Sequence, residues 1–166
     1  MNDHSSIEQL IQRILAGAPG AQLDVEDLDL NEVGRHGRTP LMVSAAEGQL
    51  AAVKWLLRSG ASVRATGRYG MTALHEASAN GDAVIARYLL SAGADVDAAT
   101  DQGVTPLMCA AAWGHMETAM LLLESQADPE RIDCRGFTAA NSAREKGEDE
   151  TADLINAYAS RSDGGS

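Results

Sequence analysis

Residues 37–42 read Gly-Arg-Thr-Pro-Leu-Met, and this stretch decides the fold because it returns three more times along the chain. The copies read Gly-Met-Thr-Ala-Leu-His at 70–75, Gly-Val-Thr-Pro-Leu-Met at 103–108 and Gly-Phe-Thr-Ala-Ala-Asn at 136–141, each 33 residues after the previous one. Further residues keep the same step; they are Gly48, Gly81, Gly114 and Gly147, and Leu56, Leu89, Leu122 and Ile155. A period of this length indicates a repeat architecture, in which similar units stack side by side.

Each unit predicts a pair of helices. In the first unit Thr39 suits an N-cap, where its hydroxyl accepts a hydrogen bond from an otherwise unpaired backbone N–H, and Pro40 suits the first helical position. This helix is expected to run through residues 41–46 and to end near Gly48. A second helix follows and ends at Gly60, with an apolar face made of Leu50, Val53, Leu56 and Leu57.

The repeated stretch, the glycines and the leucine positions together resemble the ankyrin repeat family. The resemblance covers residues 35–159, with three full units at 35–67, 68–100 and 101–133 and a degenerate fourth at 134–159. It implies an all-α solenoid of stacked helix-turn-helix units with projecting β-turn fingers. It also implies that the finger tips and the concave surface of the first helices bind a partner.

The two ends of the chain are expected to cap the stack, because terminal units need a polar outer face. Residues 1–34 predict an N-terminal capping helix and an acidic connector. The helix opens at Ser5-Ser6-Ile7-Glu8, which is typical of a capping box, and its apolar side is Ile7, Leu10, Ile11, Ile14 and Leu15. Residues 18–34 show no clear helix pattern. At the other end Ala140 and Asn156 replace leucines, which indicates a solvated cap, and residues 160–166 predict a disordered tail.

Composition limits the partners that the chain can take. Its formal net charge of −11 argues against nucleic acid and against an anionic membrane, and the acids concentrate at the two ends. No stretch is apolar enough to span a bilayer, and the first residues lack a secretory signal. We therefore expect a cytoplasmic protein with free thiols at Cys109 and Cys134. Polar caps at both ends favour a monomer.

Candidate catalytic or metal-binding residues are few. His75 follows Thr72 by three residues, and in the ankyrin family this pairing belongs to a structural hydrogen-bond arrangement at the first helix. His115 and Cys109 lack the spacing of metal ligands, and the chain has neither a phosphate loop nor a nucleophile elbow. The acidic run 148–150 is read as a solvated face. We expect no metal, no cofactor and no enzymatic activity.

Setting the scaffold positions aside leaves a strip of candidate partner-binding residues. They are Arg35, His36, Arg38, Glu47, Arg68, Tyr69, Met71, Asn80, Asp101, Gln102, Trp113, Arg135 and Phe137. Tyr69 and Trp113 are favoured as contacts because rigid aromatic side chains are enriched at interface hot spots. Phe137 suits packing of the last unit equally well, and Trp55 and Tyr88 are expected to pack in their second helices. The arginines predict an acidic patch on the partner.

The leading interpretation is a non-catalytic protein-binding module that acts as an adaptor or an inhibitor. An alternative is an acidic inhibitor of the immunity-protein or antitoxin type, in which carboxylates at 24–32 and 145–153 engage a basic toxin or nuclease. A second alternative is a regulatory subunit of an enzyme. The fold leaves the partner open, because scaffolds of this kind keep their shape while changing what they bind.

Overall fold

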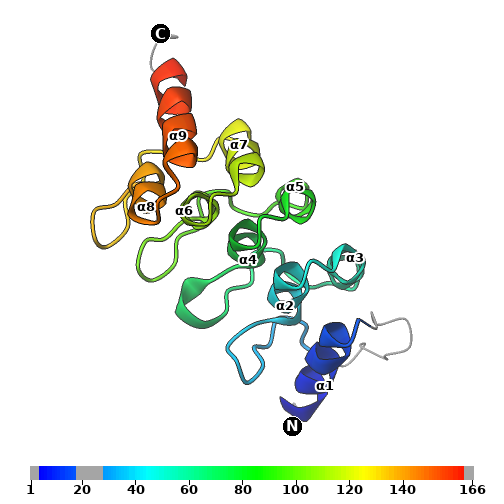
Figure 1. Cartoon of the computed structure of the whole chain (residues 1–166). Helices are drawn as coiled ribbons and strands as arrows, with labels where there is room; N and C mark the ends of the chain where they lie inside the picture. Colours follow the sequence, from blue (N-terminus) through cyan, green and yellow to red (C-terminus); the bar gives the residue numbers. More distant parts are fainter. Residues whose placement is uncertain (1–3, 18–27, 163–166) are drawn as a thin grey trace.

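The computed structural model describes residues 4–17 and 28–162, and within them the chain is a stack of short helix pairs (Figure 1). The first helices of the units form one row: α2 (Pro40–Ala46), α4 (Ala73–Ala79), α6 (Pro106–Ala112) and α8 (Ala139–Glu145). The second helices form an outer row: α3 (Leu50–Arg58), α5 (Ala83–Ser91), α7 (Met116–Glu124) and α9 (Asp149–Ser162). Helix α1 (His4–Leu15) precedes the stack, and η1 (Arg68–Gly70) is a single 3-10 turn. The described residues contain no strand, so the predicted all-α repeat solenoid is confirmed.

Four threonines start the first helices as the sequence predicts. The side chains of Thr39, Thr72, Thr105 and Thr138 each accept a hydrogen bond from the backbone N–H three residues later. Pro40 and Pro106 occupy the first helical position. Each cap contributes about 1 kcal/mol, but a helix of seven residues is too short to persist alone. Packing between units must supply the rest of the stability.

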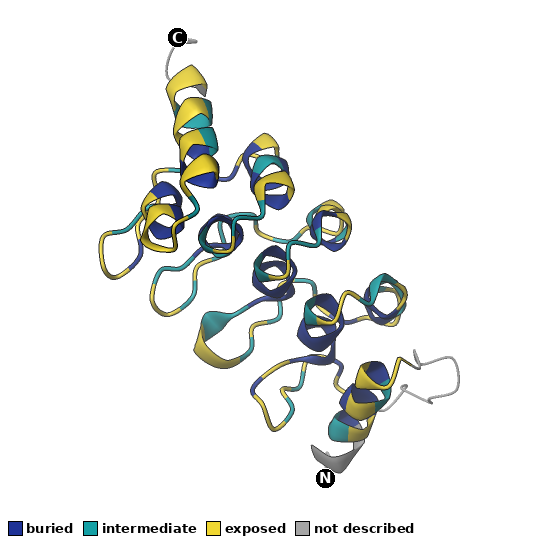
Figure 2. Ribbon diagram, viewed as in Figure 1, coloured by how far each residue is buried: buried dark blue, intermediate teal, exposed yellow. Residues whose placement is uncertain are grey.

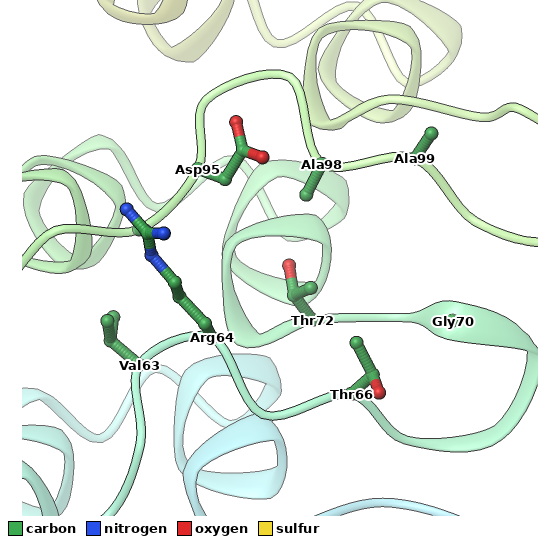
Figure 3. Close-up of a pocket in the computed structure, with 9 residues that line it drawn as sticks. Val63, Arg64, Thr66, Gly70, Thr72, Asp95, Ala98 and Ala99 are labelled. Atoms are coloured by element: carbon green, nitrogen blue, oxygen red, sulfur yellow. The ribbon is translucent and has the colours of Figure 1, made fainter.

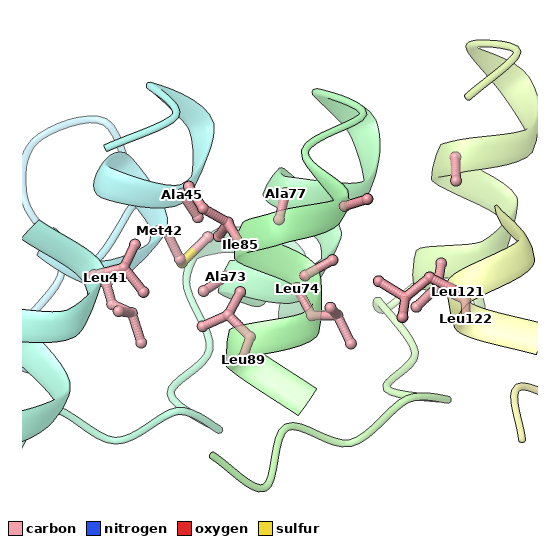
Figure 4. Packing of buried hydrophobic residues seen from close by; sticks show 14 of the residues in the cluster. Leu41, Met42, Ala45, Ala73, Leu74, Ala77, Ile85, Leu89, Leu121 and Leu122 are labelled. Carbon is pink, nitrogen blue, oxygen red and sulfur yellow. The ribbon is translucent and has the colours of Figure 1, made fainter. Parts of the chain in front are cut away.

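The core runs through the whole stack between the two helix rows. The repeated leucines of the second helices, Leu56, Leu89 and Leu122, are fully buried, and Ile155 is 1% exposed. Figure 2 shows the first helices α2, α4 and α6 almost entirely buried, while α8 and the second helices keep an exposed side. In Figure 4 small alanines such as Ala73 and Ala77 lie between larger side chains of neighbouring helices. These small residues allow close helix packing.

Two histidines fasten neighbouring units together. The Nδ1 atom of His75 accepts from the backbone N–H of Thr72 (3.2 Å), and its Nε2 donates to the carbonyl of Val104 in the next unit (3.0 Å). His115 donates from Nε2 to the carbonyl of Ala79 in the preceding unit (3.0 Å). His75 is completely buried, and burial lowers its pKa, so it is neutral near pH 7. The predicted structural role of His75 is confirmed.

The fingers are tight turns that also bond to one another. Each finger closes on itself, as where the Gly67 N–H donates to the Met71 carbonyl (2.8 Å). Neighbouring fingers are joined by backbone hydrogen bonds, from Asp101 to Tyr69 (2.9 Å) and from Cys134 to Gln102 (2.8 Å). Between the first two fingers the Arg68 N–H donates to the Gly37 carbonyl. This acceptor lies one residue later in the repeat than the acceptors Tyr69 and Gln102 of the other two bonds. The second finger therefore sits differently on its neighbour.

The ends of the stack differ in detail from the sequence predictions. Helix α1 begins at His4, so Ser5 lies inside the helix rather than at its cap. Ile7, Leu10, Ile11 and Ile14 are buried, whereas Leu15, the last residue of the helix, is 44% exposed. Helix α9 continues to Ser162, past the predicted boundary at 159, and the Ser160 hydroxyl in this last turn donates to the Asn156 carbonyl (2.8 Å). Residues 18–27 of the connector and 163–166 of the tail lie outside the described residues, and residues 28–34 contain a turn and no helix.

None of the helices in the described part of the chain is long and apolar enough to cross a bilayer.

Candidate partner-binding surface

The predicted site residues lie on one side of the molecule, which we call the finger face. It consists of the fingers (residues 34–38, 67–71, 100–104 and 133–137) and of the first helices α2, α4, α6 and α8, whose exposed side chains lie mainly at their carboxyl ends. In Figure 1 the fingers project from this row of helices on the side away from the second helices. Most of the predicted residues are exposed here, and only Met71 and Phe137 are half-buried. Glu47, Asn80 and Trp113 lie at the carboxyl ends of their first helices, opposite the fingers. The structure gathers part of this set into three hollows.

The largest group of polar side chains surrounds a groove of about 230 Å3 between α6 and α8. Trp113 and Lys146 lie at the carboxyl ends of the two helices, while Asp133 and Arg135 line the groove from the last finger. The remaining lining residues are Val104, Met108, Cys109, Ala112, Ser142 and Glu145. Trp113 is 67% exposed, so most of its ring is open to a partner. The groove is open, polar at its rim and apolar along α6.

Arg135 is held in place rather than left free for a partner. Its guanidinium pairs with Asp133 (2.9 Å) and with Glu145 (2.9 Å). It also stacks over the ring of Phe137 at 4.6 Å from the centroid. Asp133 lies in the same finger and Glu145 lies on α8, so the positive charge predicted to attract an acidic partner is neutralised locally. Phe137 serves as a platform for this arginine.

Arg38 is also paired, with a carboxylate that the sequence reading overlooked. Its Nε lies 2.9 Å from Glu76 of the next unit, and Glu76 is only 7% exposed. Burial raises the pKa of Glu76, and the charge and hydrogen bond of Arg38 oppose this rise. The pair connects the first finger to α4 and places a charged group in the middle of the finger face.

Arg38→Met is expected to destabilise the protein by about 1–2 kcal/mol near pH 7, because it leaves the buried Glu76 carboxylate unpaired; half-exposure of Arg38 keeps the cost below that of a fully buried pair. A carboxyl whose folded pKa is raised loses stability as pH rises through that pKa, so the deficit should shrink below about pH 5. Urea unfolding at both pH values measures it. The double variant Arg38→Met with Glu76→Gln should recover stability at pH 7; an unchanged deficit would mean that lost packing, not charge, is responsible.

Cys109 lies beside Glu76 and lines the groove between α6 and α8. Burial, together with the negative charge of Glu76, raises the pKa of its thiol to about 12. A thiol with such a pKa stays protonated at neutral pH and is a poor nucleophile. Cys109 therefore contributes shape to the groove and no reactivity.

Tyr69 borders a second hollow between two fingers. It is 67% exposed and shares a pocket of about 270 Å3 with Met71, Thr100, Gln102 and Val104. Its backbone has a φ of 63°, in the left-handed region that costs energy for any residue with a side chain. The corresponding residues of the other fingers are His36, Gln102 and Arg135, and none of them has a positive φ. The strained turn presents the tyrosine ring to solvent, with the Arg68 guanidinium 5.9 Å from its centroid.

The first finger and α1 enclose a smaller hollow of about 80 Å3, to which His36, Arg38 and Glu47 contribute. Glu8 of α1 accepts a hydrogen bond from the backbone N–H of Arg35 (3.2 Å). This bond, more than the nearby charges of Arg35 and His36, lowers the pKa of Glu8. The basic residues of the first finger therefore face a carboxylate of the capping helix.

Other predicted residues stay outside these hollows. Asn80, Asp101 and Arg68 are exposed on the finger face but line none of the three. A further pocket of about 170 Å3 between the first and second units contains no predicted residue (Figure 3). Its Arg64 donates from Nε to the Gly93 carbonyl (2.9 Å), and its Asp95 accepts from the Asp97 N–H (3.1 Å). Both polar side chains thus support loops.

The sequence reading missed the line of residues along the centre of the finger face. One repeat position is occupied by Val43, Glu76, Cys109 and Ser142, and these lie on successive first helices. A buried scaffold position would be expected to repeat one kind of side chain. The change from valine to a carboxylate, a thiol and a hydroxyl at a 33-residue step was the available signal.

The described residues contain no group of three histidine, cysteine, aspartate or glutamate side chains that could hold a metal ion.

Comparison with known families agrees with the repeat pattern. Residues 2–100 match a family model for ankyrin repeats in three copies, and residues 84–123 match a second model for ankyrin repeats in many copies. No curated protein matches the chain.

Proposed function

Because the chain belongs to the ankyrin repeat family, whose repeats generally mediate protein–protein interaction, we propose that it binds a partner protein through the finger face and performs no chemistry of its own. One observation carries the proposal: Tyr69 and Trp113 expose two-thirds of their surface, each beside a hollow. Large exposed aromatics beside hollows are the residues that dominate binding energy in interfaces.

The two aromatics form separate contact points. Tyr69 lies in the finger before α4, and Trp113 lies at the far end of α6. A first helix of seven residues is about 10 Å long, so the two side chains sit at opposite edges of the finger face. A partner that reaches both must cover the face from the fingers to the helix ends. Their contributions to binding are then expected to be additive.

The backbone of Tyr69 supports a binding role over a structural one. Glycine would occupy the left-handed conformation without steric cost, and the tyrosine is 67% exposed, so burial in the core does not account for the strain. Strain retained at an exposed aromatic is typical of a residue kept for function.

Alanine at both Tyr69 and Trp113 is expected to weaken partner binding at least about 30-fold, because truncating one hot-spot residue costs about 2 kcal/mol or more. Affinity capture from the native cell, with wild-type and double-variant protein in parallel, identifies the partner as the protein lost with the variant. Tyr69→Gly is the matched test: it should weaken binding without lowering the melting temperature. Equal recovery of every captured protein by wild type and double variant would refute the proposal.

The finer parts of the proposal concern the partner and the state of the protein. We infer an adaptor or an inhibitor, acting as a monomer in the cytoplasm. The exposed polar side chains of the last helix, Asp149, Glu150, Asp153 and Asn156, support a monomer because they disfavour end-to-end stacking. Free thiols at Cys109 and Cys134 suit a reducing compartment.

An acidic inhibitor of a basic toxin or nuclease is the second candidate. The observation that favours it is the exposed run of Asp149, Glu150 and Asp153 on α9, although Asp153 pairs with Arg144 at 3.2 Å. The acids at 24–27 lie outside the described residues. Lysine at Asp149 and Glu150 should abolish capture under this alternative and leave it intact if the finger face is the binding surface.

A further inference from the structure

The outer row of helices contains a groove that the finger face does not include. It lies between α3 and α5 and has a volume of about 330 Å3. Its lining residues are Leu50, Lys54, Val84, Arg87, Tyr88 and Ser91. In Figure 1 these helices stand on the opposite side of α2 and α4 from the fingers, so a molecule in this groove would leave the finger face free.

Charge on the second helices changes sign along the stack. Helices α3 and α5 contain the bases Lys54, Arg58 and Arg87 and no acid, whereas α7 contains Glu117 and Glu124 and no base. The same repeat position is held in turn by Lys54, Arg87, Met120 and Asp153. In a chain with a net charge of −11, two adjacent helices without an acid form a local basic surface.

The bases of α3 and α5 are available to a partner. Arg58 and Arg87 form no ion pair with any residue in the described ranges. Lys54 crosses the groove, with its ammonium 5.4 Å from the centroid of the Tyr88 ring. Asp82 precedes α5 as its N-cap residue, and its carboxylate accepts a hydrogen bond from the Ile85 N–H (2.8 Å). On the finger face, by contrast, Arg38 and Arg135 are paired with carboxylates.

The groove also has an apolar wall. Val84 is 62% exposed, and Leu50 and Tyr88 beside it are half-buried. At the repeat position of Val84 the other units have Ala51, Glu117 and Glu150. Because Val84 is exposed, it contributes nothing to the core. Only a binding partner would cover the apolar wall that it forms with Leu50 and Tyr88.

We propose that the groove between α3 and α5 is a second binding site, which takes an acidic segment of a partner protein with one apolar side chain between its carboxylates. Lys54 and Arg87 in the groove meet the carboxylates, and the wall of Leu50, Val84 and Tyr88 meets the apolar side chain. A nucleic acid or an anionic membrane fits less well, because the net charge of −11 and the acids of α7 repel an extended polyanion.

Fluorescence anisotropy with a labelled acidic peptide containing a central leucine tests the site. Lys54→Glu with Arg87→Glu is expected to weaken binding about tenfold. The control is Arg131→Glu with Arg161→Glu, which changes the net charge equally at two exposed bases outside the groove and should leave binding unchanged. Val84→Ala and a peptide without the leucine should each weaken binding several-fold, and NMR shifts should fall on α3 and α5.

Several results would overturn this proposal. One is that the peptide does not bind wild type, and another is that both charge-reversed pairs lose the same amount of peptide affinity. A third is that the NMR shift changes are confined to the fingers. The last two are stronger binding of duplex DNA or anionic vesicles to the same residues, and self-association of the protein that the Lys54 and Arg87 changes abolish. Alanine at Tyr69 and Trp113 should leave peptide binding intact. Failure of the groove and failure of the finger face are therefore separate outcomes.

Discussion

Leu89→Ala is expected to lower the free energy of unfolding by about 2–5 kcal/mol. Leu89 is completely buried on α5, where the second unit meets its neighbours on both sides. Removing its side chain forfeits the transfer free energy and leaves a cavity between short helices that cannot close around it. For a domain stabilised by roughly 5–15 kcal/mol this is a large share. Urea unfolding followed by circular dichroism measures the change.

Val84→Ala on the same helix is the matched control. Val84 is 62% exposed, so its truncation should change stability by less than about 0.5 kcal/mol. Ile155→Ala, at the same repeat position as Leu89 but in the last helix, should cost less than Leu89→Ala, because a terminal unit can open without its neighbours. Equal effects at 84 and 89 would contradict the burial pattern of the stack.

His75→Ala is expected to cost about 2–4 kcal/mol, because it removes a buried side chain and leaves the Val104 carbonyl without its hydrogen bond. His75→Asn is the informative comparison. Asn141 holds this position in the fourth unit, where its Oδ1 accepts from the Thr138 N–H (3.1 Å). Asparagine should therefore preserve the helix cap, lose the bond to the next unit and cost less than alanine. Thermal unfolding of both variants separates the two contributions.

The same histidine should make stability depend on pH. Burial lowers the pKa of His75 below its ordinary value of 6.5, so the unfolded chain binds the proton more readily. Its contribution is complete above about pH 6.5 and is lost as the pH falls through the lower folded pKa. Wild type should thus lose more stability than His75→Asn between about pH 7 and pH 5. Parallel curves for the two proteins would show that His75 does not titrate on unfolding.

The sequence predicted the fold because every scaffold feature recurs at the same step. Thr39 and Pro40 place the start of a helix to the residue, and the buried leucines of the second helices lie where the 33-residue register puts them. The predicted helix boundaries differ from the structure at the two ends of the chain, where α1 begins before Ser5 and α9 continues beyond 159. There, no second copy of the repeat could be compared to place the boundary.

The candidate surface was less predictable because it depends on contacts between units. Sequence position indicated that Arg38 and Arg135 are exposed, but not that Glu76 and Asp133 neutralise them. Tyr69 was a candidate from its position, whereas nothing in the sequence indicated that its backbone is left-handed. The bases of α3 and α5 were not among the sequence candidates, which came from the fingers and the first helices. Both pairs join residues of different units, and a sequence pattern read one unit at a time does not reveal them.

The arrangement of contacts also has a mechanical consequence. Helices touch substantially only within a unit or between adjacent units, from α1 against α2 to α8 against α9. Tension applied between the two ends would therefore load the interfaces in series rather than all at once. Units should yield one at a time, and each 33-residue unit that opens would add up to about 110 Å of extended chain. The stack would therefore lengthen in equal steps while its remaining units stay folded.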